Sequence, residues 1–237
     1  MKKQTIICCF LFAFFLGSQL NSQTQIGVRG GVSFATINDD SSVFTDTEKG
    51  YLTGYDFAAF AKIGLAEFIS LQPEFHYVRK GVKYSSTSQI NPEAQYSFVY
   101  DYIELPVLAR ADFGNEDLKV NFFAGPSFGY GLKGKAKYKN ILDGSGDPEV
   151  LTTTEEDLEW DKEYGTDGIK DNRFDISGVL GIGLEYGIGP VKAVLDGRYV
   201  MDFNDHFNYE NSTVTKLDKY MNRGFSLTIG VAYPLGN

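Results

Sequence analysis

Hydrophobic and polar residues alternate along the chain, most regularly between Arg173 and Tyr199. An alternation with a period of two predicts β-strands, because successive side chains of a strand point to opposite faces. A short break at 187–190 divides this stretch into a hairpin of two long strands. One face of the hairpin is apolar, whereas the other mixes charged residues with glycine. This division is typical of a membrane β-barrel, whose outer face meets lipid and whose inner face lines the lumen.

Eight segments with this alternation can be counted. They cover residues 25–36, 52–63, 68–83, 97–111, 118–132, 174–186, 191–199 and 224–233. The connections alternate between long (38–50, 84–95, 133–172, 204–221) and short (64–67, 112–117, 187–190). Short turns at one end and long loops at the other characterise outer-membrane barrels. The sequence therefore predicts an all-β fold: an eight-stranded antiparallel up-and-down transmembrane β-barrel with short periplasmic turns, long extracellular loops and both termini in the periplasm.

Glycine placement distinguishes this fold from a soluble, lipocalin-like barrel, whose apolar face would point inward around a ligand. The glycines concentrate on the polar face: Gly27, Gly31, Gly125, Gly129, Gly131, Gly181, Gly183 and Gly230. An eight-stranded barrel has an interior only just wide enough for side chains to fill, so the face with small residues belongs inside. The bulky face is then expected to contact lipid, which makes outer-membrane lipid the first expected partner.

Tyrosines occur near the ends of the predicted strands: Tyr55, Tyr77, Tyr130, Tyr186, Tyr199 and Tyr233. Tyrosine suits a membrane interface, where the ring lies in the apolar region and the hydroxyl stays hydrated. Tyrosine is also a favourable strand residue in general, so both interpretations stay open at any single position.

The N-terminal segment predicts export. Two lysines, a short apolar run and small or polar residues fill positions 1–22 and resemble a secretory signal peptide. Residues 23–237 then form one barrel domain. Both cysteines, Cys8 and Cys9, lie inside the predicted signal, so the mature chain brings no thiol for a disulfide, a nucleophile or a metal site. The expected location is the cell outer membrane.

The net charge of −9 is concentrated in residues 143–171 of one predicted loop, 133–172. Its acidity argues against a nucleic-acid surface. The loop begins with lysines at alternate positions: Lys133, Lys135, Lys137 and Lys139. Counting parity along the strand places them on the luminal face, where they are expected to pair with the acidic residues that follow and fold the loop over the mouth. Binding to lipopolysaccharide phosphate would require the outward face.

Charges of both signs are predicted to point into the lumen: Arg29, Asp56, Lys62, Glu74, Lys80, Glu104, Arg110, Lys119, Asp175, Glu185, Lys192, Asp196 and Arg198. A narrow barrel is expected to pair such groups, because an isolated charge in a confined apolar space is costly. The pattern favours a closed, salt-bridged interior. A gated or ion-selective pore is the functional alternative.

Candidate chemistry is sparse. His76 shares the inward face with Glu74, and His206 follows Asp205, but no serine motif accompanies either histidine. We therefore expect structural histidines, no catalytic residues and no cofactor. The segment 143–149 places oxygen donors at alternate positions as a calcium loop does, yet Pro148 occupies the glycine position of that pattern. A solvated turn is the preferred interpretation, and no metal site is expected.

Several short motifs resemble the PorT-like outer-membrane β-barrel family of Gram-negative bacteria, which has the architecture of the small OmpA/OmpX-type barrels. They are 70–75 (SLQPEF) followed by Tyr77 and 80–81, then 102–106 (YIELP), 124–126 (AGP) and 196–199 (DGRY). The likeness extends from about Gln25 to Tyr233. It implies an outer-membrane barrel, and for PorT itself an association with protein secretion.

Three hypotheses follow for the function. The leading one is a non-enzymatic, monomeric outer-membrane barrel whose extracellular loops form an interaction or capping surface, with a protein partner and a role in the envelope or in secretion. The second is a narrow porin-like channel. The third is a membrane-embedded lipid hydrolase or acyltransferase.

Overall fold

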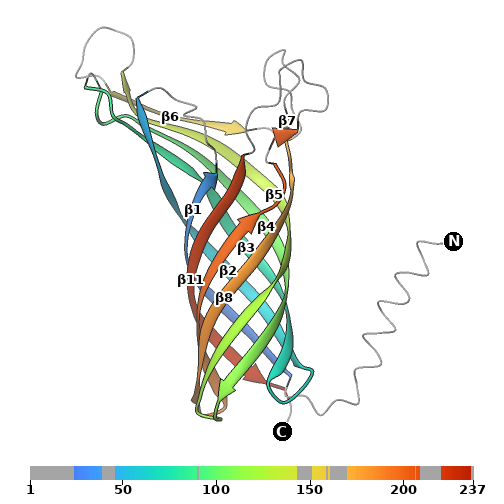
Figure 1. The fold of residues 1–237 in the computed structure, drawn as a ribbon. Helices are drawn as coiled ribbons and strands as arrows, with labels where there is room; N and C mark the ends of the chain where they lie inside the picture. The colour runs from blue at the N-terminus through green and yellow to red at the C-terminus, as the bar shows by residue number, and fades with distance from the viewer. Residues whose placement is uncertain are drawn as a thin grey trace, which may run out of the picture.

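The computed structural model describes residues 24–38, 46–89, 91–142, 151–158, 160, 170–205, 207–208 and 220–235 (Figure 1). The predicted signal peptide, 1–22, lies outside the described residues. No helix in the described part of the chain is long and apolar enough to cross a membrane.

The described residues form β-strands. They are β1 (Gln25–Asn38), β2 (Thr47–Gly64), β3 (Ile69–Ser86), β4 (Gln95–Gly114), β5 (Leu118–Leu142), β6 (Leu151–Leu158), β7 (Lys170–Asp171), β8 (Phe174–Ile188), β9 (Val191–Asp202), β10 (Phe207–Asn208) and β11 (Met221–Pro234). Eight of them close a barrel in the order β1-β2-β3-β4-β5-β8-β9-β11, with β11 pairing back onto β1. All neighbours are antiparallel, which confirms the predicted eight-stranded barrel.

Bulky apolar side chains cover the outside of the barrel. Phe122, Ile182 and Leu227 are each about half exposed, whereas Arg198 is buried inside. Small residues make room for the interior groups: a side chain at Gly181 would occupy the position of the Phe123 ring, which lies in the lumen. The predicted assignment of the two faces is therefore confirmed.

The two ends of the barrel differ. At the turn end, three short connections join the strands, and Gly114 and Gly189 take positive φ angles of 132° and 59° there, as glycine allows. Both termini of the barrel lie at this end, where the Leu235 N–H donates to the Thr24 carbonyl at 2.7 Å. The opposite end carries the long connections and is called the loop end.

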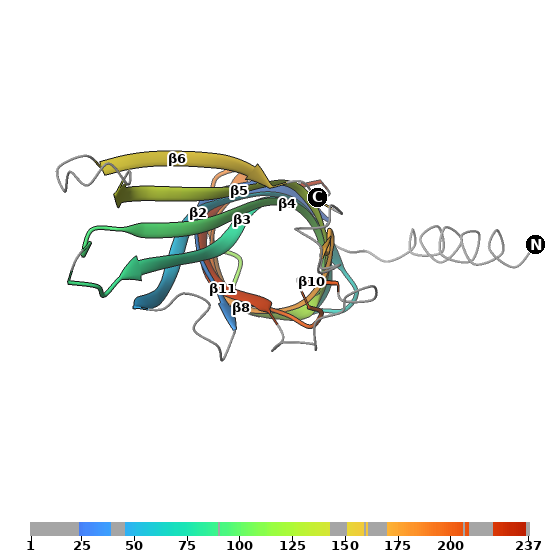
Figure 2. The ribbon, with the colours of Figure 1, turned by 90° about the horizontal axis from the view of Figure 1, so that it is seen from above.

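At the loop end, strands continue where loops were predicted. Residues 47–51, 82–86, 95–99 and 134–142 of β2 to β5 extend beyond the closed wall, and β6 adds to the edge of β5. This five-stranded sheet is called the extension. It leans away from the barrel axis to one side (Figure 1), and the view along the axis shows its strands lying side by side beyond the barrel outline (Figure 2). The predicted loop boundaries at 38–50, 84–95 and 133–172 were therefore wrong.

A β-bulge at the base of the extension changes which residues face outward. Tyr102 pairs with Gly131, but the preceding Asp101 pairs with Lys133, so Leu132 is an extra residue in β5. Beyond the bulge, Lys135 and Lys137 lie on the face that continues the outside of the barrel. The prediction that these lysines are luminal is wrong, because the extra residue inverts the parity.

The pairing of these lysines with the acidic segment is confirmed. Lys137 lies 2.6 Å from Glu155 of β6, and Lys135 lies 3.3 Å from the same carboxylate and 3.7 Å from Asp157. Their face is called the outer face of the extension, and the face that continues the lumen is called the inner face. On the inner face the rings of Tyr96 and Tyr138 meet edge to face at 6.0 Å.

A cluster of two tyrosines and an arginine–aspartate ion pair lies on the outer wall just below the extension. The rings of Tyr55 and Tyr77 lie 5.4 Å apart, and the Tyr55 hydroxyl donates to Asp101 at 3.0 Å. Arg79 holds the same carboxylate at 2.7 Å and stacks over Tyr55. These residues are suited to an interface, with apolar rings toward the wall and charges toward water. The predicted tyrosines at the other end, Tyr186 and Tyr233, are also exposed on the outer wall.

Candidate functional site

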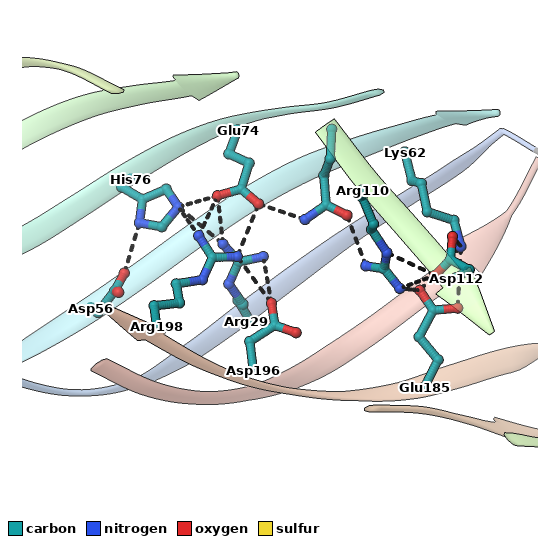
Figure 3. Close-up of polar contacts among 11 residues, drawn as sticks. Arg29, Asp56, Lys62, Glu74, His76, Arg110, Asp112, Glu185, Asp196 and Arg198 are labelled. Carbon is teal, nitrogen blue, oxygen red and sulfur yellow. Dashed lines mark hydrogen bonds and ion pairs between the residues drawn. The ribbon is translucent and has the colours of Figure 1, made fainter. Parts of the chain in front are cut away.

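The most organised chemistry of the molecule lies in the lumen, where charged side chains form three layers along the barrel axis. The turn-end layer contains Lys62, Arg110, Asp112, Lys119, Glu185 and Lys192. The central layer contains Arg29, Asp56, Glu74, His76, Asp196 and Arg198. The loop-end layer contains Lys80, Glu104, Asp175 and Asp202. Figure 3 shows the central layer and part of the turn-end layer, with side chains converging from opposite walls.

The turn-end layer is centred on Glu185. This carboxylate of β8 receives Arg110 of β4 at 2.5 Å and Lys62 of β2 at 3.2 Å. Arg110 also reaches Asp112 at 2.8 Å. Lys192 stays 3.7 Å from Glu185. Lys119 is half-buried at the same mouth and forms no ion pair with another described residue. This layer therefore carries an excess of cations.

The central layer is centred on Glu74, which is buried. Arg198 of β9 holds it with two contacts, 2.7 and 3.0 Å, in the bidentate geometry that strengthens a guanidinium–carboxylate pair. Arg29 of β1 donates to it at 2.7 Å. Asp196 completes the layer, 3.0 Å from Arg198 and 3.4 Å from Arg29. Four strands, β1, β2, β3 and β9, are thus linked across the lumen when His76 and its partner Asp56 are included.

Gln72 joins the central layer to the turn-end layer. Its amide nitrogen donates to Glu74 at 2.6 Å, and its carbonyl oxygen accepts from Arg110 at 2.8 Å. The polar network is therefore continuous along this part of the lumen.

His76 lies between two carboxylates. Its Nδ1 is 2.9 Å from Asp56 and its Nε2 is 2.6 Å from Glu74. Carboxylates accept hydrogen bonds and do not donate them, so only the imidazolium form can donate from both nitrogens. An imidazolium would balance the layer, with three cations against three carboxylates. Both ring nitrogens are occupied, which leaves neither to activate a nucleophile.

The loop-end layer has the opposite imbalance. Lys80 faces three carboxylates: Glu104 at 2.6 Å, Asp175 at 2.8 Å and Asp202 at 3.2 Å. Its ammonium also lies 5.4 Å from the centre of the Tyr102 ring. The charge of the lumen therefore changes along the axis, from cationic at the turn end to anionic at the loop end.

Aromatic residues close the lumen above this layer. Tyr100 and Tyr102 are buried, and the indole of Trp160 packs against both, with ring centres 5.5 and 5.8 Å apart. Trp160 belongs to the predicted acidic loop, and Leu158 of β6 joins the same contact. Part of that loop therefore covers the loop-end mouth.

Little empty space remains inside. The cavity between the central and loop-end layers has a volume of about 40 Å³ and is lined by groups that include Asp56, His76, Lys80 and Arg198. This is room for one or two water molecules. At the turn end a vestibule of about 1000 Å³ opens past Lys62 and Lys119, and the turn-end layer forms its floor.

The structure places the predicted charges on the inner wall. The alternation in the sequence missed three further members of the network. Asp112 was assigned to a turn, although it follows Arg110 at the luminal spacing of two. Asp202 is the second luminal position beyond the predicted end of its strand at Tyr199. Gln72 shares the luminal parity but is uncharged, so no signal in the sequence marked it as the link between two layers. His206 and the segment 143–149 lie outside the described residues.

Comparison with known proteins places the chain in a family. A family model described as "Outer membrane protein beta-barrel domain" matches residues 18–208. No curated protein matches the chain at a significant level.

Three solved structures illustrate the likeness in fold. The attachment invasion locus protein Ail of Yersinia pestis shares 14% identity over 89% of this chain and 99% of its own, with a TM-score of 0.39. Neisserial surface protein A shares 16% identity over 89% and 97%, with a TM-score of 0.41. OprG from Pseudomonas aeruginosa shares 10% identity over 91% and 98%, with a TM-score of 0.43. The family match, together with a closed barrel whose wall is apolar outside and charged inside, shows that this chain is an outer-membrane protein and belongs to the outer membrane protein beta-barrel domain family.

Proposed function

We propose that this protein is a non-enzymatic, non-conducting, monomeric outer-membrane barrel that presents the extension at the cell surface as an interaction platform. The observation that carries the proposal is the contrast between a lumen filled by ion pairs and a wall that continues as an ordered sheet beyond the barrel. A lumen built for transport or catalysis would need open space, and the cavity here holds about 40 Å³.

Closure of the lumen supports the non-conducting role over the porin-like alternative. The central layer spans the bore through Arg29, Glu74 and Arg198, whose side chains are 0–1% exposed. Opening a path for hydrated ions would require breaking these contacts, and an unpaired buried charge is costly. Trp160 adds a second closure at the loop end.

The orientation follows the usual order of such barrels. The turn end is assigned to the periplasm and the loop end to the cell exterior. The segment 1–22 is assigned as the export signal. In this orientation the extension lies outside the cell, next to the outer leaflet.

The inner face of the extension is the proposed site for a protein partner. Tyr51 is exposed, and Tyr96 and Tyr138 are half-buried on that face. Rigid aromatic rings with a polar tip are enriched at protein interfaces. The likeness to the PorT-like family suggests that such a partner belongs to the envelope or to a secretion pathway.

Two measurements test the proposal. Refolded protein in planar bilayers should give no stepwise conductance, either in KCl or in salts of larger ions. Reproducible single-channel steps would contradict the proposal and favour the porin-like channel. In cells, a photo-crosslinking residue at Tyr138 should give a protein adduct, whereas the same residue at lipid-facing Phe122 should not. Equal protein adducts at both positions, or none at Tyr138, would remove the inner face as the docking site.

A single-cysteine variant tests the orientation separately. Thr154→Cys should react with a membrane-impermeant maleimide in intact cells, because the mature chain brings no competing thiol. Labelling only after the cells are opened would reverse the assignment of the two ends.

A further inference from the structure

The outer face of the extension is rich in lysine. It carries Lys83 of β3 and Lys133, Lys135, Lys137 and Lys139 of β5. Direct strand pairing fixes this arrangement, because Lys83 lies opposite Ser97, which in turn lies opposite Lys137, and residues in register share a face. Carboxylates of the described residues are fewer on the same face: Glu48, Glu155 and Asp157. The described part of this face therefore has a net positive charge.

The position of these lysines relative to the lipid-facing wall is defined by the chain itself. On β5 the outward residues Phe128, Tyr130 and Leu132 are exposed and apolar or aromatic, and the lysines begin at the next residue. From Lys133 to Lys139 the strand advances by about 20 Å, at roughly 3.3 Å per residue. The cations thus start where the apolar band ends.

The tilt of the extension determines what this face meets. The strands of the extension lean outward, away from the barrel axis (Figures 1 and 2). A wall that leans outward turns its outer face toward the surface from which the barrel emerges. The lysines are therefore directed at the headgroup layer beside the barrel.

We propose that the outer face of the extension rests on the outer leaflet and binds the phosphate groups of its anionic glycolipid. Lys83, Lys133 and Lys139 have no ion pair with another described residue, and Lys135 and Lys137 share Glu155 at side-chain exposures of 42% and 38%. Long lysine side chains can lie along an apolar surface and place the ammonium among headgroups. Clusters of lysine beside a membrane attract anionic lipid headgroups at close range. The inference uses the orientation proposed above but not the proposed protein partner.

Lipid binding can be measured on the mature barrel reconstituted in nanodiscs. The lipid would be phosphatidylcholine alone, or phosphatidylcholine with diphosphoryl lipid A or its dephosphorylated form. The triple variant K83Q/K133Q/K139Q should bind diphosphoryl lipid A about a hundredfold more weakly, roughly fivefold per lysine. K49Q, on the inner face, is the matched control and should bind as the parent does. Unchanged affinity in the triple variant, an equal loss in K49Q, or equal binding of the dephosphorylated lipid would overturn the proposal.

A second measurement does not depend on folding of the triple variant. A fluorophore attached at Ser97→Cys, on the outer face, should be quenched by a spin label on the lipid headgroup. The same fluorophore at Thr154→Cys, on the inner face, should not. Equal quenching at both sites, or stronger quenching at residue 154, would show that the extension does not lie on the membrane by this face. Both lipid measurements use reconstituted protein, so their results do not depend on which end of the barrel faces the cell exterior. A negative result here would therefore overturn lipid binding without affecting the conductance, crosslinking and maleimide tests of the proposed function.

Discussion

Strands β2 to β5 run through both the barrel and the extension, but the two regions distribute charge in opposite ways. Inside the barrel, charges face the lumen, and those of the central layer are buried; Arg198 and Glu74, whose side chains are 1% and 0% exposed, each contact several partners. On the extension, most lysines lie on the outer face and the charged side chains stay exposed to solvent; Lys137 and Glu155 are 38% and 45% exposed. The contrast shows that strand pairing alone does not decide how a charge contributes. Its surroundings do, because water screens exposed pairs and leaves buried ones dependent on their partners.

The point of change lies at two irregularities. In β5 it is the extra residue Leu132, and in β2 the register with β3 shifts between Tyr51 and Asp56. Bulges bend the bulged strand and increase its twist. They allow the same strands to leave the closed wall and to turn their lysines outward.

The largest effect is expected from Glu74, the anion that two arginines and His76 share. Glu74→Gln keeps the shape of the side chain but leaves Arg29 and Arg198 without their main partner. We expect a loss of about 3–5 kcal/mol in the free energy of unfolding, the range for breaking a buried ion pair. Urea unfolding in lipid vesicles, followed by tryptophan fluorescence and heat-modifiable gel migration, would measure it. Glu156→Gln on the extension is the matched control and should change stability by less than about 0.5 kcal/mol.

The next effect concerns the anionic loop-end layer. Lys80→Gln leaves three carboxylates facing one another and should destabilise the barrel by about 3 kcal/mol, at the lower end of the same range because the adjoining cavity can admit water. Asp202→Asn removes one of the excess negative charges of this layer. It should change the free energy of unfolding by less than about 1 kcal/mol or increase it. Both values can be measured in the same unfolding assay. A larger loss in Asp202→Asn than in Lys80→Gln would show that the layer is not anionic in the folded protein.

The bulge itself can be removed. Deleting Leu132 should leave Lys133 directly after Gly131, in the register that Asp101 and Tyr102 of β4 already define. Lys135 and Lys137 should therefore stay on the outer face and keep their contacts with Glu155, while the bend introduced by the bulge is lost and the barrel loses only about 1–2 kcal/mol. Hydrogen exchange should show that protection across β6 is retained. Leu132→Ala keeps the extra residue and is the matched control. A deletion variant that loses protection across β6, or in which Lys135 and Lys137 turn to the inner face, would mean that Leu132 is not the extra residue of the strand.

Much of the barrel could be predicted from the sequence, for a physical reason. A strand between lipid and a narrow lumen must alternate strictly, so Phe122 and Ile182 could be assigned outward and Arg198 inward without knowledge of any contact. The ion-pair partners could not be predicted, because the alternation gives the face of the strand on which a residue lies but not its position along the barrel axis. The meeting of Arg110, Glu185 and Gln72 depends on strand register, which the sequence does not state.

The extension could not be predicted because both of its faces contain polar residues. Residues 134–142 alternate lysine with alanine, tyrosine and glycine, a pattern also compatible with a polar loop. The sequence did not indicate the bulge either, since the extra residue is Leu132 and not a glycine or a proline. Counting parity through that position carried the error to every lysine beyond it.

The smallest expected effect is on the exposed pairs of the extension, and it concerns pH. Hydrogen bonds from Lys137 and Lys135 lower the pKa of Glu155 below its ordinary value. A carboxyl whose pKa is lowered on folding contributes stability above its unfolded pKa, and the contribution is lost as pH falls through the folded value. NMR titration of Glu155 should therefore give a midpoint below that of a free glutamate. The midpoint should rise in the Lys137→Gln variant and at high salt. Because Glu155 is solvent-exposed, overall unfolding should hardly change over this pH range, so a marked acid loss of stability should instead originate in the buried layers of the lumen.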